Sequence, residues 1–117
     1  MRANAYLAAT ALLSGCANWT THDTYREAAA LSLLAIDYGQ TRTIAKNPDQ
    51  WYEQNPILGE HPSVAEVNRY FALAAVGHVA VSAALPPKWR KVWQYVTIGV
   101  EAAAVGHNMS LGIGVSW

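Results

Sequence analysis

Three apolar stretches separated by proline-containing segments dominate the chain. The first spans residues 24–45 and is apolar on every side from Ala28 to Ile36. Thr24 is followed three residues later by Glu27, which is the pattern of a capping box, where each side chain bonds the other residue's backbone N–H. A helix over 24–45 is therefore predicted, with its central third buried.

The second and third stretches predict a helical hairpin. Ser63 with Glu66 three residues later forms another capping-box pattern, so a helix is expected over 63–85. Pro86-Pro87 ends that helix and opens a third one over 88–107, because proline is tolerated in the first turn of a helix. The expected fold is all-α, a small three-helix bundle.

Two further segments lack a helical pattern. Residues 47–62 contain three prolines and one glycine among aromatic and aliphatic side chains, which is typical of an ordered connector. The C-terminal segment Leu111–Trp117 alternates larger apolar residues with small ones. This alternation predicts either a short strand or an extended tail.

The N-terminus has the pattern of an exported, lipid-modified protein. A positively charged start and a short apolar run lead directly into Leu13-Ser14-Gly15-Cys16. That ending resembles the lipobox of bacterial lipoprotein signal peptides, in which the cysteine is acylated and becomes the first residue of the mature chain. The resemblance implies that residues 1–15 are removed, that 16–117 form a single helical membrane-associated domain, and that Cys16 carries a covalent lipid such as palmitate. The alternative is an uncleaved helix with a buried cysteine.

Composition narrows the classes of function. Hydrophobic residues make up 52% of the chain against 14% charged residues, which is apolar-rich for a small domain. The formal net charge is zero and no basic stripe interleaved with aromatics is present, so nucleic-acid binding is not expected. The sequence has one cysteine, which excludes an intramolecular disulfide and a multi-cysteine metal site.

Charge placement leaves two arrangements relative to a membrane. Lys88, Arg90 and Lys91 lie in the hairpin turn, and basic turns favour the cytoplasm, whereas a lipidated Cys16 lies on the periplasmic side. Both conditions hold if the last two helices pass through or into the membrane, although their apolar runs have only about fifteen residues and spanning takes roughly seventeen. The other arrangement is a wholly extracytoplasmic bundle whose basic turn contacts acidic head groups.

Each apolar helix also carries one polar seam. Gln94, Glu101 and Asn108 recur every seventh residue, so they share one face of their helix. The seams are expected to face one another, which would place Glu101 in an internal cluster with His78 and Asp37. A structural hydrogen-bond network is the favoured role. The predicted polar core comprises Asp37, Gln40, Thr41, His78, Gln94, Glu101 and Asn108.

Two chemical roles remain open for the same residues. A histidine with two carboxylates can perform acid–base catalysis, so an enzyme would use His78, Glu101 and Asp37. His78, Glu101 and His107 offer metal ligands but lack a tight pattern such as H-E-x-x-H. We therefore expect no metal and no cofactor beyond the lipid on Cys16, and an enzyme is the less favoured interpretation.

The middle of the chain carries a second resemblance. Asp37-x-x-Gln40-Thr41, followed by Glu53-x-Asn55-Pro56-Ile57-Leu58-Gly59, resembles a loosely defined family of small, uncharacterised bacterial and phage-encoded helical membrane proteins. The resemblance covers residues 31–85 and implies a helical membrane-associated fold, with no activity assigned. It implies importance for Asp37, Thr41, Glu53, Asn55 and Pro56, with no role attached.

Together these patterns predict a lipid-anchored helical protein of the bacterial cell envelope, with its N-terminus on the periplasmic side. It would act by contact with membrane lipid and with another envelope protein or a second copy of itself. If it is phage-encoded, an accessory role in lysis or superinfection exclusion is expected. The alternative is a small intramembrane metal-binding protein or hydrolase that uses Asp37, His78 and Glu101.

Overall fold

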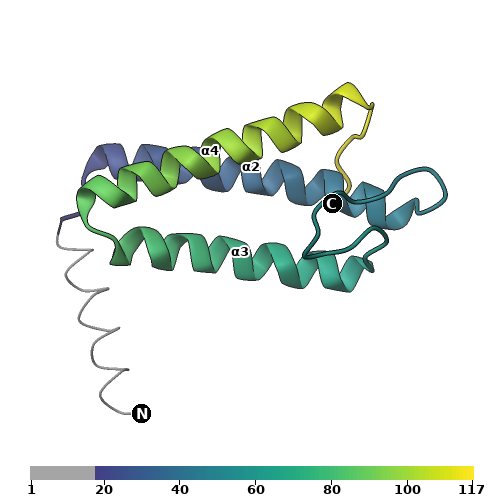
Figure 1. Ribbon diagram of the computed structural model, residues 1–117, viewed down its shortest axis with the longest axis horizontal. Coiled ribbons are helices and arrows are strands. Elements are labelled where there is room, and N and C mark those ends of the chain that lie inside the picture. Colours follow the sequence, from purple (N-terminus) through teal and green to yellow (C-terminus); the bar gives the residue numbers. More distant parts are fainter. Residues whose placement is uncertain (1–17) are drawn as a thin grey trace, which may run out of the picture.

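The computed structural model describes residues 18–117, so the predicted signal peptide and Cys16 lie outside the described residues. Three helices make up this part of the chain: α2 over Thr21–Lys46, α3 over Val64–Ala84 and α4 over Pro87–Ser110. They run side by side along the long axis, with the α3–α4 turn at one end and the connector and C-terminal tail at the other (Figure 1). The predicted all-α three-helix bundle is confirmed.

The starts of α2 and α3 are set by capping boxes. Ser63 and Glu66 form the predicted box at α3. At α2 the box is formed by Thr20 and Asp23, one turn earlier than the pair expected from the sequence. The earlier start moves Glu27 away from the helix end and into the interior, where it is 6% exposed. The prediction that Glu27 caps a helix is therefore wrong.

α2 is the central helix of the bundle. It packs extensively against both α3 and α4, whereas α3 and α4 contact each other far less. The apolar core cluster between α2 and α3 is small and consists of Leu34, Val67 and Phe71. The largest fully buried side chains are mostly polar, so much of the packing between helices is hydrogen-bonded rather than apolar. These side chains are Arg90, Gln40, Gln94, Val67, Thr41 and Ser82.

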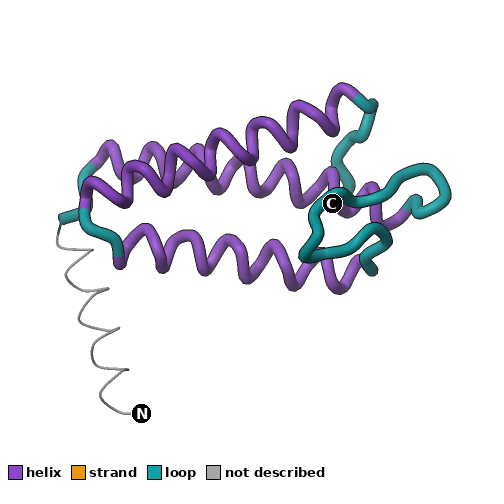
Figure 2. The backbone as a smooth tube through the Cα atoms, viewed as in Figure 1, coloured by secondary structure: helices purple, strands orange, loops and turns teal. Residues whose placement is uncertain are grey.

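None of the helices between residues 18 and 117 has both the length and the apolarity that a membrane crossing requires. This finding contradicts passage of the second and third helices through a membrane, which was one form of the two arrangements left open by the sequence. Polar residues recur along both α3 and α4. The loops that join the helices lie at the two ends of the bundle (Figure 2).

Polar groups order the connector between α2 and α3, as its sequence predicts. Glu53 Oε1 accepts a hydrogen bond from the backbone N–H of Asn55 at 2.9 Å. The side chain of Asn55 accepts from the N–H of Ile57 and donates to the hydroxyl of Tyr70, each at 2.9 Å. Pro56 continues this segment in an exposed turn. The connector is thereby fixed to α3.

The C-terminal tail is extended and docks on α2. The backbone N–H of Ser116 donates to the carbonyl of Gly39 at 2.9 Å, and Arg42 Nε donates to the carbonyl of Ser116 at 3.1 Å. Of the two alternatives for this segment, the extended tail is correct. Gly39 permits the approach, because a Cβ at that position would lie 2.9 Å from the Cβ of Val115.

Gly39→Ala is expected to detach the tail while changing the free energy of unfolding by less than about 1 kcal/mol. The added methyl group meets Val115, but alanine is the better helix former by roughly that amount. Hydrogen exchange at the Ser116 amide should rise at least about tenfold as the tail opens locally. Gly77→Ala on α3 is the matched control, because a Cβ there meets open space. Equal exchange in both variants would contradict the prediction.

Candidate functional site

Two polar clusters lie inside the bundle where one was expected. We call the first the turn-end cluster, because it lies toward the α3–α4 turn. Its members are Asp23, Arg26, Glu27, His78, Ser82, Arg90, Gln94 and Thr97. We call the second the connector-end cluster. Its members are Asp37, Gln40, Thr41, Glu53, Glu101 and Asn108.

Glu27 is the central acceptor of the turn-end cluster. Its Oε1 lies 2.6 Å from His78 Nδ1. Its Oε2 accepts from the Ser82 hydroxyl at 2.7 Å and from Gln94 Nε2 at 2.9 Å. Three donors thus compensate the burial of one carboxylate. Glu27 takes the place beside His78 that the sequence interpretation gave to Glu101.

His78 continues this chain of contacts to α4. Its Nε2 lies 2.8 Å from Thr97 Oγ1, and its ring stacks on Trp93 at a centroid distance of 4.9 Å. The order carboxylate, imidazole, hydroxyl is also that of a catalytic triad. However, Thr97 lies within a helix, whose backbone N–H groups are engaged and form no oxyanion hole. Its hydroxyl also lies 3.0 Å from the Trp93 carbonyl, an ordinary contact for a helical threonine. The geometry favours a structural role.

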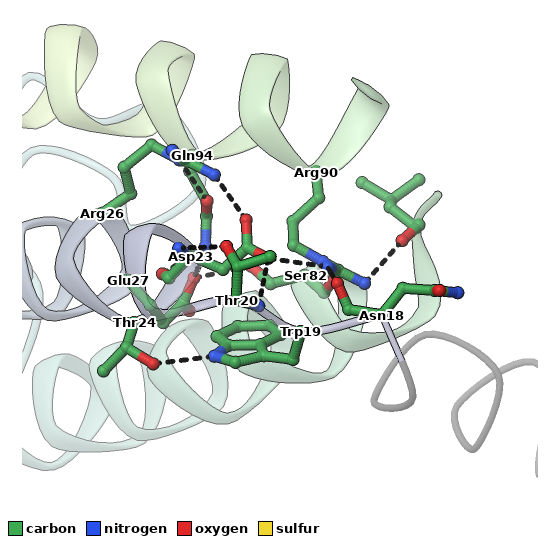
Figure 3. A network of polar contacts seen from close by, with 11 residues as sticks. Asn18, Trp19, Thr20, Asp23, Thr24, Arg26, Glu27, Ser82, Arg90 and Gln94 are labelled. Carbon is green, nitrogen blue, oxygen red and sulfur yellow. Dashed lines mark hydrogen bonds and ion pairs between the residues drawn. The ribbon is translucent and has the colours of Figure 1, made fainter. Parts of the chain in front are cut away.

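Arg90 and Asp23 close the cluster toward the turn (Figure 3). Arg90 is completely buried, and its Nη1 lies 3.0 Å from Asp23 Oδ2. Its Nε donates to the Ser82 carbonyl at 2.7 Å and its Nη2 to the Leu85 carbonyl at 3.0 Å. Burial acts to raise the pKa of Asp23, but hydrogen bonds from Thr20 and Arg90 outweigh it, so this pKa lies below its ordinary value.

The sequence interpretation missed Arg90 as a core residue and assigned it to an exposed basic turn. Arg90, Gln94, Thr97 and Glu101 follow one another at spacings of four, three and four residues, which keeps them on one helix face. The polar seam of α4 therefore begins one turn earlier than Gln94. That spacing was the signal from which Arg90 could have been assigned to the core. Of the three basic residues in the turn, only Lys88 and Lys91 are exposed.

The connector-end cluster joins two carboxyl groups between α2 and α4. The side chains of Asp37 and Glu101 are hydrogen-bonded to each other, which requires a proton on one of them. Burial, and then the neighbouring Asp37, raises the pKa of Glu101 to about 8. Burial raises the pKa of Asp37 as well. The pair therefore holds one proton at neutral pH.

Glu53 approaches this pair from the connector. Burial raises its pKa, and the charge of Asp37 adds to the rise, while the N–H groups of Asn55 and Gln54 oppose it. The three carboxyl groups line a cavity of about 270 Å³ that His107 also borders. Nearby, Asn108 Nδ2 donates to Gln40 Oε1 at 3.1 Å, which ties α4 to α2. The predicted facing of the α2 and α4 seams is correct in this half of the bundle.

The predicted catalytic and metal-binding combinations are not assembled. His78 is engaged by Glu27 and Thr97, Glu101 is engaged by Asp37, and His107 is exposed. His78 and Glu101 do line one groove of about 340 Å³ between α3 and α4, although each bonds to other partners. Within residues 18–117, no three His, Cys, Asp or Glu side chains are grouped so that they could hold a metal ion.

Comparison of the chain with protein-family models, with curated proteins and with solved structures finds no match.

Proposed function

We propose that the protein is a helical bundle of the bacterial cell envelope that works by contact at a membrane surface, where a lipid on Cys16 anchors it. The proposal depends mainly on the uncharged exterior of α3 from Tyr70 onward and of α4 from Val92 onward. From Tyr70 to Pro87 the sequence has no Asp, Glu, Lys or Arg. From Val92 to Trp117 the sole residue of these four types is Glu101, which points to Asp37 inside the bundle.

Apolar side chains take the places that charged ones usually hold on a water-facing helix. On α3, Leu73 and Val76 are 67% and 71% exposed. On α4, Val92, Val96 and Val100 repeat every fourth residue on one exposed face. Exposed apolar side chains in such numbers are typical of a surface that contacts a membrane or a partner. A lipid surface is the partner that we propose for the exposed apolar side chains of both helices.

The hydrogen bonding inside the bundle supports a function in contact with a partner rather than in catalysis. The buried polar groups of the turn-end cluster bond to one another and to backbone carbonyls, which fixes the relative register of three alanine-rich helices. Such a network makes a rigid support for an apolar exterior. The hydrolase alternative would need His78 to act on a group in the α3–α4 groove, and His78 is already bonded on both ring nitrogens.

Val96→Asp is expected to lower binding of the full-length chain to phosphatidylcholine vesicles about tenfold, since a charge on an apolar interfacial face costs more than about 1 kcal/mol. The measurement is vesicle flotation in a Cys16→Ser background, which removes any contribution of an acyl chain. Ser32→Asp adds the same charge to the exposed face of α2 and should bind like the parent. Equal binding of the two variants would remove the support for the proposal.

The anchor itself is tested by mass spectrometry of the mature N-terminus in a bacterial host. The expected species begins at Cys16 and carries the added mass of acyl chains, and Cys16→Ser should abolish both the processing and the mass. Unchanged processing in Cys16→Ser would contradict the lipid anchor.

A further inference from the structure

We propose that the end of the bundle formed by the α3–α4 turn and the first turns of α4 docks on an anionic phospholipid surface. The inference rests on the proposed membrane-surface function and deepens it, because it names the face and the charge of the lipid. We call this surface the turn-end patch. It consists of Lys88, Trp89, Lys91, Val92 and Val96.

Exposed basic and aromatic side chains lie together on this patch. Lys88, Trp89 and Lys91 are all exposed, with Trp89 at 55%. Lys88 Nζ lies 5.5 Å from the centre of the Trp89 ring. Tryptophan favours the head-group level of a bilayer, and lysine favours anionic lipid. Trp89 also begins the apolar stripe that continues through Val92 and Val96, so the patch and the exterior of α4 form one surface.

The acidic side chains at this end are internal, which leaves the patch positive. Asp23 and Glu27 are the carboxylates of the first four turns of α2, and they are 3% and 6% exposed. Asp23 is paired with Arg26 and Arg90, and Glu27 with His78. The sequence has no Asp or Glu between Glu66 and Glu101. The patch is therefore complementary in charge to an anionic surface.

The chain also enters the bundle at this end. Arg90 Nη1 donates to the carbonyl of Asn18 at 3.2 Å, and the Arg90 guanidinium lies over the Trp19 ring at 4.9 Å (Figure 3). Asn18 follows Cys16 by two residues in the sequence. A lipid on Cys16 would therefore be attached two residues before the point where the chain enters this end of the bundle, where the two lysines also lie. A single acyl chain gives only marginal membrane binding, and a basic patch beside it supplies the second signal that stable anchoring needs.

The experiment compares vesicles of phosphatidylglycerol with vesicles of phosphatidylcholine, using the full-length chain with Cys16→Ser at low salt. Each lysine near an anionic surface contributes about 1 kcal/mol, so the parent should prefer phosphatidylglycerol by about thirtyfold. Lys88→Gln with Lys91→Gln should remove this preference and leave phosphatidylcholine binding unchanged. Lys46→Gln, exposed at the opposite end of α2, is the matched control and should keep the preference. Salt should weaken the parent's preference.

Two outcomes would overturn the inference. Equal binding of the parent to both vesicles would show that the patch does not recognise anionic lipid and would favour an acidic protein partner. Loss of the preference in Lys46→Gln as large as in the double variant would show that charge anywhere on the molecule suffices. Either result leaves the proposed function standing if Val96→Asp still weakens binding to phosphatidylcholine. Failure of Val96→Asp with retained lysine dependence would instead remove the apolar exterior as a contact surface and leave docking through Lys88 and Lys91 standing.

Discussion

Arg90→Met is expected to lower the free energy of unfolding by about 3–5 kcal/mol, which is the usual cost of breaking a buried ion pair from one side. The variant leaves Asp23 buried without Arg90 and removes the donors to the carbonyls of Ser82 and Leu85. Small domains have about 5–15 kcal/mol of stability in total. The change should therefore appear as a large fall in the urea midpoint followed by circular dichroism.

Lys88→Met is the matched control for this substitution. It makes the same type of change two residues earlier in the same helix, on an exposed side chain, and should alter stability by less than about 0.5 kcal/mol. If Arg90→Met proves too unstable to purify, the double variant Asp23→Asn with Arg90→Met should recover part of the loss, because the buried carboxylate, which keeps only Arg26 as a charged partner, is then neutral. Equal urea midpoints for Arg90→Met and Lys88→Met would contradict the role of the ion pair.

The helices and their order were predictable because their signals are local. The Ser63 cap and Pro86-Pro87 act within a few residues, and the structure places the ends of α3 and α4 within a few residues of the prediction. The start of α2 was not predictable in the same way, because Thr20 with Asp23 and Thr24 with Glu27 both match a capping box. The choice is made by packing. Three side chains in the interior hydrogen-bond to the Glu27 carboxylate. If Glu27 capped the helix instead, these side chains would lose that partner.

The polar interior was predictable in outline and not in its pairings. Spacing along α4 correctly predicted that its polar face meets α2, where Glu101 contacts Asp37 and Asn108 contacts Gln40. Spacing within one helix carries no information about its axial shift relative to another. That shift decides that His78 of α3 lies level with Glu27 rather than with Glu101.

The free energy of unfolding is expected to fall as the pH rises from about 5 to about 8. The pKa of Glu101 is about 8 in the folded protein and close to its ordinary value of 4.5 in the unfolded chain. Between these values the folded state binds the proton more tightly, so the stabilisation is complete below the unfolded pKa and is lost as pH rises through the folded pKa. Each pH unit in this window costs at most about 1.4 kcal/mol.

Other buried carboxyl groups also change how the free energy of unfolding depends on pH. Asp37 and Glu53 also have raised pKa values, so their titration adds to the loss of stability with rising pH. Asp23 has a lowered pKa, so its contribution is lost in the opposite direction, as pH falls below the ordinary value of 3.8. Stability should therefore be greatest in mildly acidic solution.

Glu101→Gln separates the shared proton from the other contributions to this pH dependence. The amide donates an N–H to Asp37 at every pH and has no charge to lose, so the variant should be more stable than the parent at pH 8–9 by about 1–3 kcal/mol and similar to it at pH 5. Urea unfolding across this range is the measurement. Glu60→Gln, exposed in the connector, removes a carboxylate of the same type and should follow the parent at every pH. If the free energies of unfolding of Glu101→Gln and the parent change in parallel from pH 5 to 9, the proton of the Asp37–Glu101 pair does not contribute to the pH dependence of stability.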